Sequence, residues 1–204
     1  MNRAMIRGLL LLSGLMLLAF ALLPAPALAQ AGHPLIGEPA PRLSGRAAFG
    51  KGLLNLNKLQ NRIVYRHDAQ GRRIREGGKL KISVEKRALV LNFFATYCIP
   101  CIQEIPAYNR VAREYAERPV KFIYVNVDTE KTAAEVRKFA VAKGIEVEMM
   151  LPSVRYALNA YKIDGLPRIV VIDRQGIVTH VILGFQEDLA RQIGDILAEV
   201  LPED

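Results

Sequence analysis

The sequence has little of what builds stapled or metal-centred proteins, with two cysteines, three histidines and no tryptophan among 204 residues. Two cysteines cannot form a disulfide-rich scaffold or a four-cysteine zinc site. The chain also lacks the composition of a disordered protein, because 51% of its residues are apolar and 24% are charged. At this length we expect one main domain with an extension.

The first residues have the pattern of an export signal. Arg3 and Arg7 precede an apolar run over residues 8–23, and Ala27-Leu28-Ala29 follows. A positive start, a short apolar core and an A-x-A ending predict a signal peptide over residues 1–29, cleaved after Ala29. A retained membrane anchor is the alternative, although the run is short for a span of ~20 residues. The mature chain is therefore expected in the periplasm or another extracytoplasmic space.

The two cysteines lie at positions 98 and 101. Disulfides persist outside the cytoplasm, yet this pair is too close in sequence to constrain the unfolded chain much. The apolar run at residues 88–94 predicts a buried strand, and a helical pattern begins after Cys101. A cysteine at a helix N-terminus has a stabilised thiolate, which is the nucleophile of disulfide exchange. The motif therefore predicts redox chemistry, with Pro100 fixing the first turn of the helix.

Two other uses of a C-x-x-C motif fit this chain less well. Half of a zinc or copper site would need further ligands, and no histidine lies near the cysteines in sequence (His33, His67, His180). Haem attachment needs a histidine directly after the second cysteine, where this chain has Ile102.

The rest of the chain alternates strands and helices. After the strand at residues 88–94 and its helix, the expected elements are a strand at 120–127, a helix at 132–143, a short strand at 147–151, a helix at 154–161, a strand at 168–172, its hairpin partner at 177–183 and a helix at 186–201. This order predicts an α/β fold with a central mixed sheet flanked by helices.

Positive charge is concentrated before this region. Residues 46–90 carry twelve lysines and arginines and three acids, so their net charge is +9 and the rest of the chain sums to −1. Residues 62–66 predict a strand, residues 68–71 a turn and residues 72–75 the returning strand. The basic segment is either a solvated hairpin or a surface that contacts anionic membrane headgroups or an acidic partner. Nucleic acid is not expected as a partner outside the cytoplasm.

The stretch from Leu91 to Pro106, which reads LNFFATYCIPCIQEIP, resembles the active-site region of extracytoplasmic thioredoxin-like proteins of the TlpA/ResA type. Gly165-Leu166-Pro167 before the strand RIVVID is a second landmark of that family. The resemblance implies a thioredoxin fold over residues 88–204. Nothing is carried over from the family onto the segment before it, where the sequence itself predicts a β-rich extension over residues 30–87 with the basic hairpin. The resemblance also implies a thiol–disulfide oxidoreductase with no cofactor beyond the redox-active disulfide and no metal.

The resemblance assigns roles to individual residues. Cys98 attacks the substrate disulfide, Cys101 resolves the mixed disulfide, and Glu104 assists proton transfer. Pro167 is implied to be cis and to lie against the disulfide. The implied substrate-contacting residues are Tyr97, Pro100, Leu166 and Pro167. Cytoplasmic thioredoxins keep a buried aspartate where this chain has Asn92, so that base is missing here.

The implied partners are disulfide-containing proteins, such as apocytochrome c during cytochrome c maturation, and a membrane protein that donates electrons. Ile99 and Pro100 offer the thiolate neither charge nor hydrogen bond, which favours a reducing couple. The alternative from another class is a copper metallochaperone that uses the two thiolates and His180. A thiol peroxidase would need threonine where the chain has Ala95.

Overall fold

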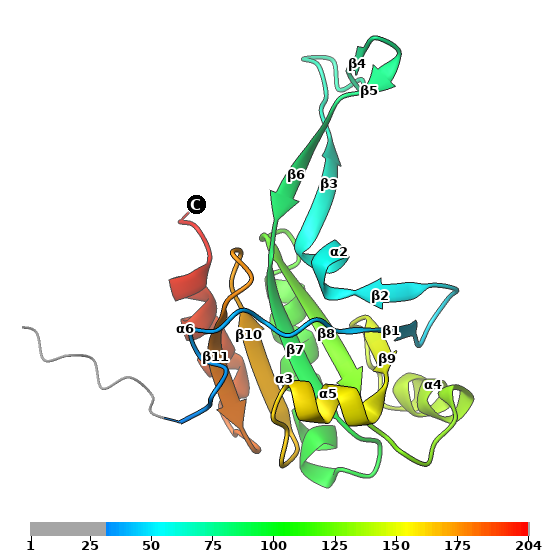
Figure 1. Cartoon of the computed structure of the whole chain (residues 1–204), viewed down its shortest axis with the longest axis vertical. Helices are drawn as coiled ribbons and strands as arrows, with labels where there is room; N and C mark the ends of the chain where they lie inside the picture. Colours follow the sequence, from blue (N-terminus) through cyan, green and yellow to red (C-terminus); the bar gives the residue numbers. More distant parts are fainter. Residues whose placement is uncertain (1–31, 204) are drawn as a thin grey trace, which may run out of the picture. The chain divides into compact units, whose positions relative to one another are not determined.

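A seven-stranded mixed sheet organises the part of the chain that the computed structural model describes, residues 32–203 (Figure 1). The expected signal peptide over residues 1–29 lies outside the described residues. The strands are β1 (Ser44–Ala47), β2 (Leu53–Asn55), β3 (Asn61–Tyr65), β4 (Arg75–Glu76), β5 (Lys79–Leu80), β6 (Ile82–Lys86), β7 (Ala88–Phe94), β8 (Val120–Asn126), β9 (Met149–Pro152), β10 (Arg168–Ile172) and β11 (Val178–Leu183). The helices are α2 (Leu56–Gln60), α3 (Ile99–Glu114), α4 (Ala133–Ala142), α5 (Val154–Ala160) and α6 (Leu189–Val200).

The strand order is β11-β10-β7-β8-β9-β1-β2. β7, β8 and β9 run parallel, while β10 is antiparallel to β7 and to β11. Every residue of β7 is buried, as its continuous apolar run predicts for a central strand. The predicted thioredoxin-like fold with a central mixed sheet is confirmed.

Helices cover both faces of the sheet. The ring of Tyr108, on α3, lies 4.7 Å from the ring of Tyr124 on β8, and Phe94 contacts the same tyrosine. The ring of Tyr161, just after α5, contacts Phe93 instead. Because neighbouring residues of a strand point to opposite faces, α3 and α5 lie on opposite sides of the sheet.

The segment before β7 is part of this sheet. β1 pairs with β9 and β2 pairs with β1, both antiparallel. A Cβ atom on Gly45 would come within 2.6 Å of the β9 backbone, so glycine permits this close pairing. Residues Pro34–Asp204 form one compact unit, and its core extends from Leu35 to Leu201. We therefore expect residues 30–204 to fold without the first 29.

The basic segment forms a two-stranded ribbon, residues 61–86, that projects from the sheet (Figure 1). The predicted return strand at residues 72–75 forms only a short pairing with residues 66–68, and it is not the partner of β3. The turn at Asp68 forms, since the backbone of Gly71 donates to it, but only an isolated bridge joins His67 to Arg73. The chain continues through the small β4–β5 hairpin, and β6 is the partner of β3.

Candidate functional site

The candidate site is a disulfide between Cys98 and Cys101, with an S–S distance of 2.00 Å. It lies where the buried strand β7 ends and α3 begins, the position predicted from the motif. Cys98 is the N-cap residue of α3, and Pro100 occupies the first turn. Proline is tolerated there because the first turn of a helix has no partner for its N–H groups.

The two sulfur-bearing residues differ in environment. Cys98 is 9% exposed and Cys101 is 2% exposed. The backbone N–H of Cys101 donates to Cys98 Sγ at 3.3 Å. A first-turn N–H and the helix dipole both stabilise negative charge at Cys98, so we expect this cysteine to have the more reactive thiolate once reduced.

Asp128 fixes the loop that carries Cys98. The backbone N–H of Thr96 donates to both carboxylate oxygens, and its hydroxyl donates to Oδ1 at 2.9 Å. The Asn126 side-chain amide donates to Oδ2 at 2.6 Å. Sequence reasoning missed Asp128, although an acid directly after a buried strand, at the edge where the parallel strand β7 also ends, was a usable signal.

Pro167 lies at the same edge of the sheet. The peptide bond between Leu166 and Pro167 is cis, as the resemblance implies. Arg168 pairs with Phe93 in the antiparallel register, so Pro167 falls opposite the end of β7. The Pro167 carbonyl accepts from Gly184 at 3.0 Å. Arg168 itself is buried and forms an ion pair with Asp164, a contact that sequence reasoning did not anticipate.

Glu104 is buried on α3, one helical turn after Cys101, with 2% of its surface exposed. The backbone N–H of Gln186, before α6, donates to Oε1 at 3.1 Å. Among the described residues, Oε2 of Glu104 has no hydrogen-bond partner. Burial raises the pKa of Glu104 to about 7, and the Gln186 N–H opposes that rise.

Two more buried polar groups share this side of the sheet. Asn92 on β7 pairs in register with Tyr124 on β8. Within residues 32–203, neither Asn92 Oδ1 nor the Tyr124 hydroxyl has a hydrogen-bond partner. Burial raises the pKa of Tyr124, and the negative charge of Glu104 raises it further. Glu104 therefore lies in a polar pocket of the core rather than in solvent.

The outer surface beside the disulfide is partly apolar. Tyr97 is 68% exposed and Ile99 is 70% exposed. Tyr97 lines a hollow of about 520 Å³ with residues 128–131. The structure thus places Tyr97 next to Cys98 along the chain and open to a partner, while Leu166 is half-buried beside Pro167.

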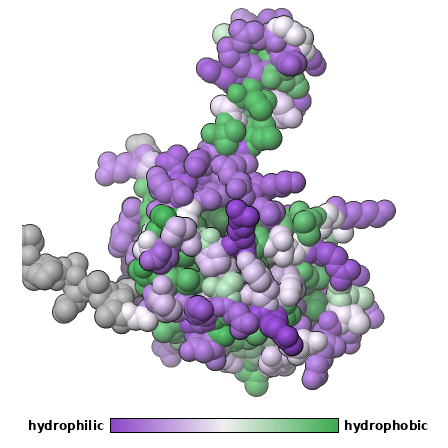
Figure 2. Space-filling view, in the orientation of Figure 1, coloured by the Kyte–Doolittle hydropathy of each residue, from purple (hydrophilic) through white to green (hydrophobic). Residues whose placement is uncertain are grey.

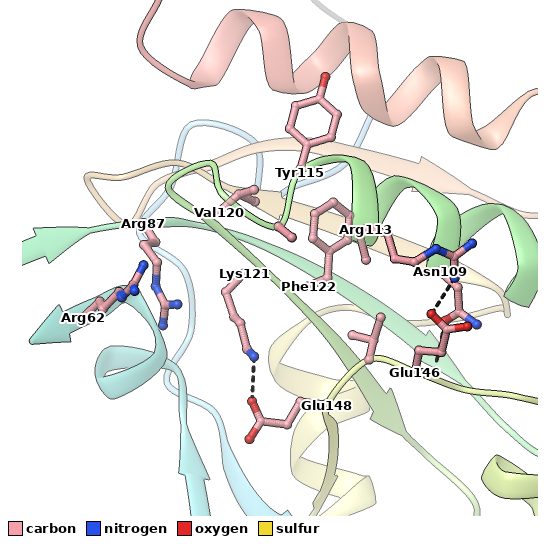
Figure 3. A pocket seen from close by; sticks show the side chains of 13 residues that line it. Arg62, Arg87, Asn109, Arg113, Tyr115, Val120, Lys121, Phe122, Glu146 and Glu148 are labelled. Carbon is pink, nitrogen blue, oxygen red and sulfur yellow. Dashed lines mark hydrogen bonds and ion pairs between the residues drawn. The ribbon is translucent and has the colours of Figure 1, made fainter. Parts of the chain in front are cut away.

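A second pocket of about 520 Å³ lies at the other end of the sheet, where β8 begins (Figure 3). Two of its four cations pair with carboxylates of the pocket wall. Lys121 pairs with Glu148 at 3.0 Å and Arg113 pairs with Glu146 at 2.5 Å. Arg87 donates to a backbone carbonyl of α2. This pocket takes no part in the disulfide site.

No group of three or more histidine, cysteine, aspartate or glutamate residues among residues 32–203 is placed to hold a metal ion. His180, the histidine considered for copper, lies on β11 with Nε2 3.6 Å from Glu199 of α6. No helix within the same described range is long and apolar enough to cross a membrane.

Comparisons with known proteins agree with this geometry. The sequence model of the AhpC/TSA family matches residues 70–181, which include both cysteines and Pro167. The thiol-disulfide oxidoreductase ResA of Geobacillus kaustophilus is 33% identical over 54% of this chain and 63% of its own length. ResA of Bacillus subtilis is 29% identical over 53% of this chain and 60% of its own. The chain thus spans less than two thirds of these relatives' length.

Solved structures show the same fold. A thiol:disulfide interchange protein of the thioredoxin family from Chlorobium tepidum is 27% identical, with a TM-score of 0.56 over 78% of this chain and 95% of that one. A thiol:disulfide interchange protein from Bacteroides sp. has a TM-score of 0.61 at 16% identity, over 80% of this chain and 90% of that one. The predicted resemblance to ResA-type proteins is confirmed.

Proposed function

The chain belongs to the AhpC/TSA family, and from this membership and its site we propose that it is a thiol–disulfide oxidoreductase that reduces protein disulfides. The observation that carries the proposal is the disulfide at the N-terminus of α3, with Cys98 as the N-cap and cis Pro167 at the same edge of the sheet. Such a position stabilises the thiolate that both attacks and leaves in disulfide exchange.

The roles of the two cysteines in the reaction follow from their solvent exposure, because Cys98 is more exposed than Cys101. In the reduced protein, the more exposed Cys98 thiolate attacks one sulfur of the substrate disulfide, and the other substrate sulfur leaves as a thiolate that takes up a proton. Cys101 then loses its proton and attacks Cys98 Sγ, which releases the second substrate thiolate. Two electrons pass to the substrate, and the protein is left with the Cys98–Cys101 disulfide.

Glu104 is the proposed proton acceptor for Cys101. It lies on the same helix three residues later, so the two side chains share a face. A carboxyl whose pKa is about 7 exchanges protons readily near neutral pH. Tyr97, Pro100 and Leu166, with Pro167, are proposed to contact the substrate polypeptide around the disulfide.

The couple is proposed to be reducing. Ile99 and Pro100 separate the cysteines and give the thiolate neither a charge nor a hydrogen bond. Equilibration with a glutathione redox buffer should give a reduction potential below about −200 mV, nearer thioredoxin than the strong oxidants. A value near −120 mV would contradict the proposed direction.

Location and partners complete the proposal. Residues 1–29 direct export, residues 30–87 form an extension, and residues 88–204 form the thioredoxin-like domain that acts in the periplasm. Substrates are disulfide-containing proteins, with apocytochrome c as the candidate in cytochrome c maturation. A membrane protein returns electrons to the Cys98–Cys101 disulfide, because a reductase outside the cytoplasm needs a supply from across the membrane.

Trapping tests the assigned roles. Cys101→Ala removes the resolving thiol, so exported extracts should yield mixed disulfides joined to Cys98 that a reductant releases. Cys98→Ala is the matched control and should trap little. Equal trapping by the two variants would show that the roles are assigned wrongly, and trapping by neither would refute the proposed exchange reaction.

A further inference from the structure

The ribbon, residues 61–86, has an apolar stripe that is exposed along its length. Antiparallel register places Ile63 opposite Val84 and Tyr65 opposite Ile82. Since alternate residues point to one face, these four side chains lie on the same side of the ribbon. In the order Ile63, Val84, Tyr65 and Ile82, their exposed fractions are 58%, 56%, 38% and 49%.

Cations are concentrated at the tip end of this apolar stripe. The ribbon tip, residues 66–81, carries six lysines and arginines and two acids, for a net charge of +4. Asp68 pairs with Arg72, and Glu76 pairs with Lys81. The remaining tip cations have no carboxylate partner within the described range (Arg66, Arg73, Arg75, Lys79). Figure 2 shows apolar surface on the ribbon between the hydrophilic tip and the body.

The stripe has cationic ends as well. Arg73 lies over the Tyr65 ring at 4.4 Å, at the tip end. Lys86 pairs with Asn61 and so falls on the stripe face at the base end. Apolar side chains with a tyrosine, bounded by lysine and arginine, are the arrangement of residues at a membrane–water interface.

We propose that the ribbon binds an anionic lipid surface, with the apolar stripe entering the interface and the tip cations contacting lipid phosphates. A second copy of the chain fits less well, because two tips of charge +4 would repel each other. Four side chains also cover far less than the ~800 Å² per partner of a standard protein interface. Each cation near an anionic membrane adds to binding, so the tip charge compensates for a small apolar area.

Co-sedimentation of residues 30–204 with phosphatidylcholine vesicles, with and without phosphatidylglycerol, tests the proposal. The chain should sediment only with vesicles that contain phosphatidylglycerol, and added salt should release part of it. Ile63→Ser with Val84→Ser should weaken binding at least tenfold. Arg75→Glu with Lys79→Glu should do the same.

Matched controls change the surface away from the ribbon. Val141→Ser replaces an apolar side chain that is 71% exposed on α4. Arg110→Glu with Arg155→Glu reverses two exposed charges on the body of the protein. Both controls should bind like the wild type. Equal binding to neutral vesicles, or loss in the controls to the same degree, would overturn the proposal.

The absence of tryptophan allows a direct test of insertion. Tyr65→Trp places one indole on the stripe, and Tyr156→Trp places one on α5, where the native ring is 49% exposed. Phosphatidylglycerol vesicles should shift the emission of the first variant to shorter wavelength and leave the second unchanged. If neither shifts while binding persists, charge alone holds the chain and insertion is refuted.

A third arm separates a lipid surface from an acidic polypeptide. Polyglutamate should neither compete with the vesicles at equal charge nor shift the indole emission of the Tyr65→Trp variant. If it competes fully, the partner is an acidic protein and the lipid proposal fails. The inference does not rest on the proposed redox function, and all ribbon variants should reduce insulin disulfides at the wild-type rate.

Discussion

Burial of Glu104 should make the oxidised protein less stable as the pH rises. Its pKa is raised from 4.5 to about 7 in the folded state, so the folded chain holds this proton more tightly than the unfolded chain. The contribution of this proton to the unfolding free energy is therefore fully present below about pH 4.5. It decreases between about pH 4.5 and about pH 7, and the unfolding free energy does not change further with this group above that pH. One pKa unit is worth about 1.4 kcal/mol, so the loss is about 3 kcal/mol.

Glu104→Gln should remove this loss, because glutamine keeps the shape and has no proton to release. Urea denaturation of both oxidised proteins at several pH values between 4 and 8.5 gives the difference in unfolding free energy. From pH 4 to pH 8.5, the unfolding free energy of the variant should rise relative to that of the wild type by about 3 kcal/mol, which corresponds to about 1.5 M in the urea midpoint. Histidine titrations are common to both proteins and cancel in the comparison.

Glu114→Gln is the control, since it changes an exposed glutamate on the same helix. It should follow the wild type at every pH. Parallel curves for wild type and Glu104→Gln would refute the reasoning, because they would mean that Glu104 is not held protonated by burial. Reduced protein is avoided in this assay, since free thiols would titrate as well.

The remaining predictions concern neighbouring parts of the fold. Asp128→Ala should lower unfolding free energy by about 3 kcal/mol and slow insulin reduction, because Thr96 loses its anchor. Gly45→Ala should cost about 1–3 kcal/mol in urea denaturation, whereas Gly52→Ala, where a Cβ meets open space, should cost less. Asn92→Asp should destabilise the protein by about 2 kcal/mol more at pH 8 than at pH 4, since it buries a second carboxyl.

The strand–motif–helix unit could be predicted because its signals are local. The continuous apolar run of β7, the cysteine pair and the helical spacing after Cys101 all lie within about one turn or strand of each other. The same holds for the β10–β11 hairpin, where Asp173 and Gly176 mark the turn. Each of these elements is packed into the core, and burial in the core is what produces a recognisable pattern of apolar residues along the sequence.

The strand pairing of the ribbon could not be predicted from local sequence patterns. Its strands have neither face in the core, so alternation of apolar and polar residues carries no information about register. A nearby turn signal at Asp68 favoured a short hairpin, whereas the true partner of β3 lies beyond a second turn at Gly77 and Gly78. Contacts such as those of Asp128 with Thr96 and Glu104 with Gln186 join residues 32 and 82 positions apart, beyond any local pattern.

The register of β7 separates the ribbon from the disulfide. β6 ends at Lys86, just before β7 begins, whereas Cys98 follows the other end of the same strand. Seven residues of strand span about 23 Å, so the two features lie at opposite ends of the sheet. A ribbon held on a lipid surface would thus leave the disulfide at the opposite end of the sheet, open to soluble substrates. The proposed membrane electron donor would then have to present its own thiols well above the bilayer, so a donor with a projecting domain is the partner to look for.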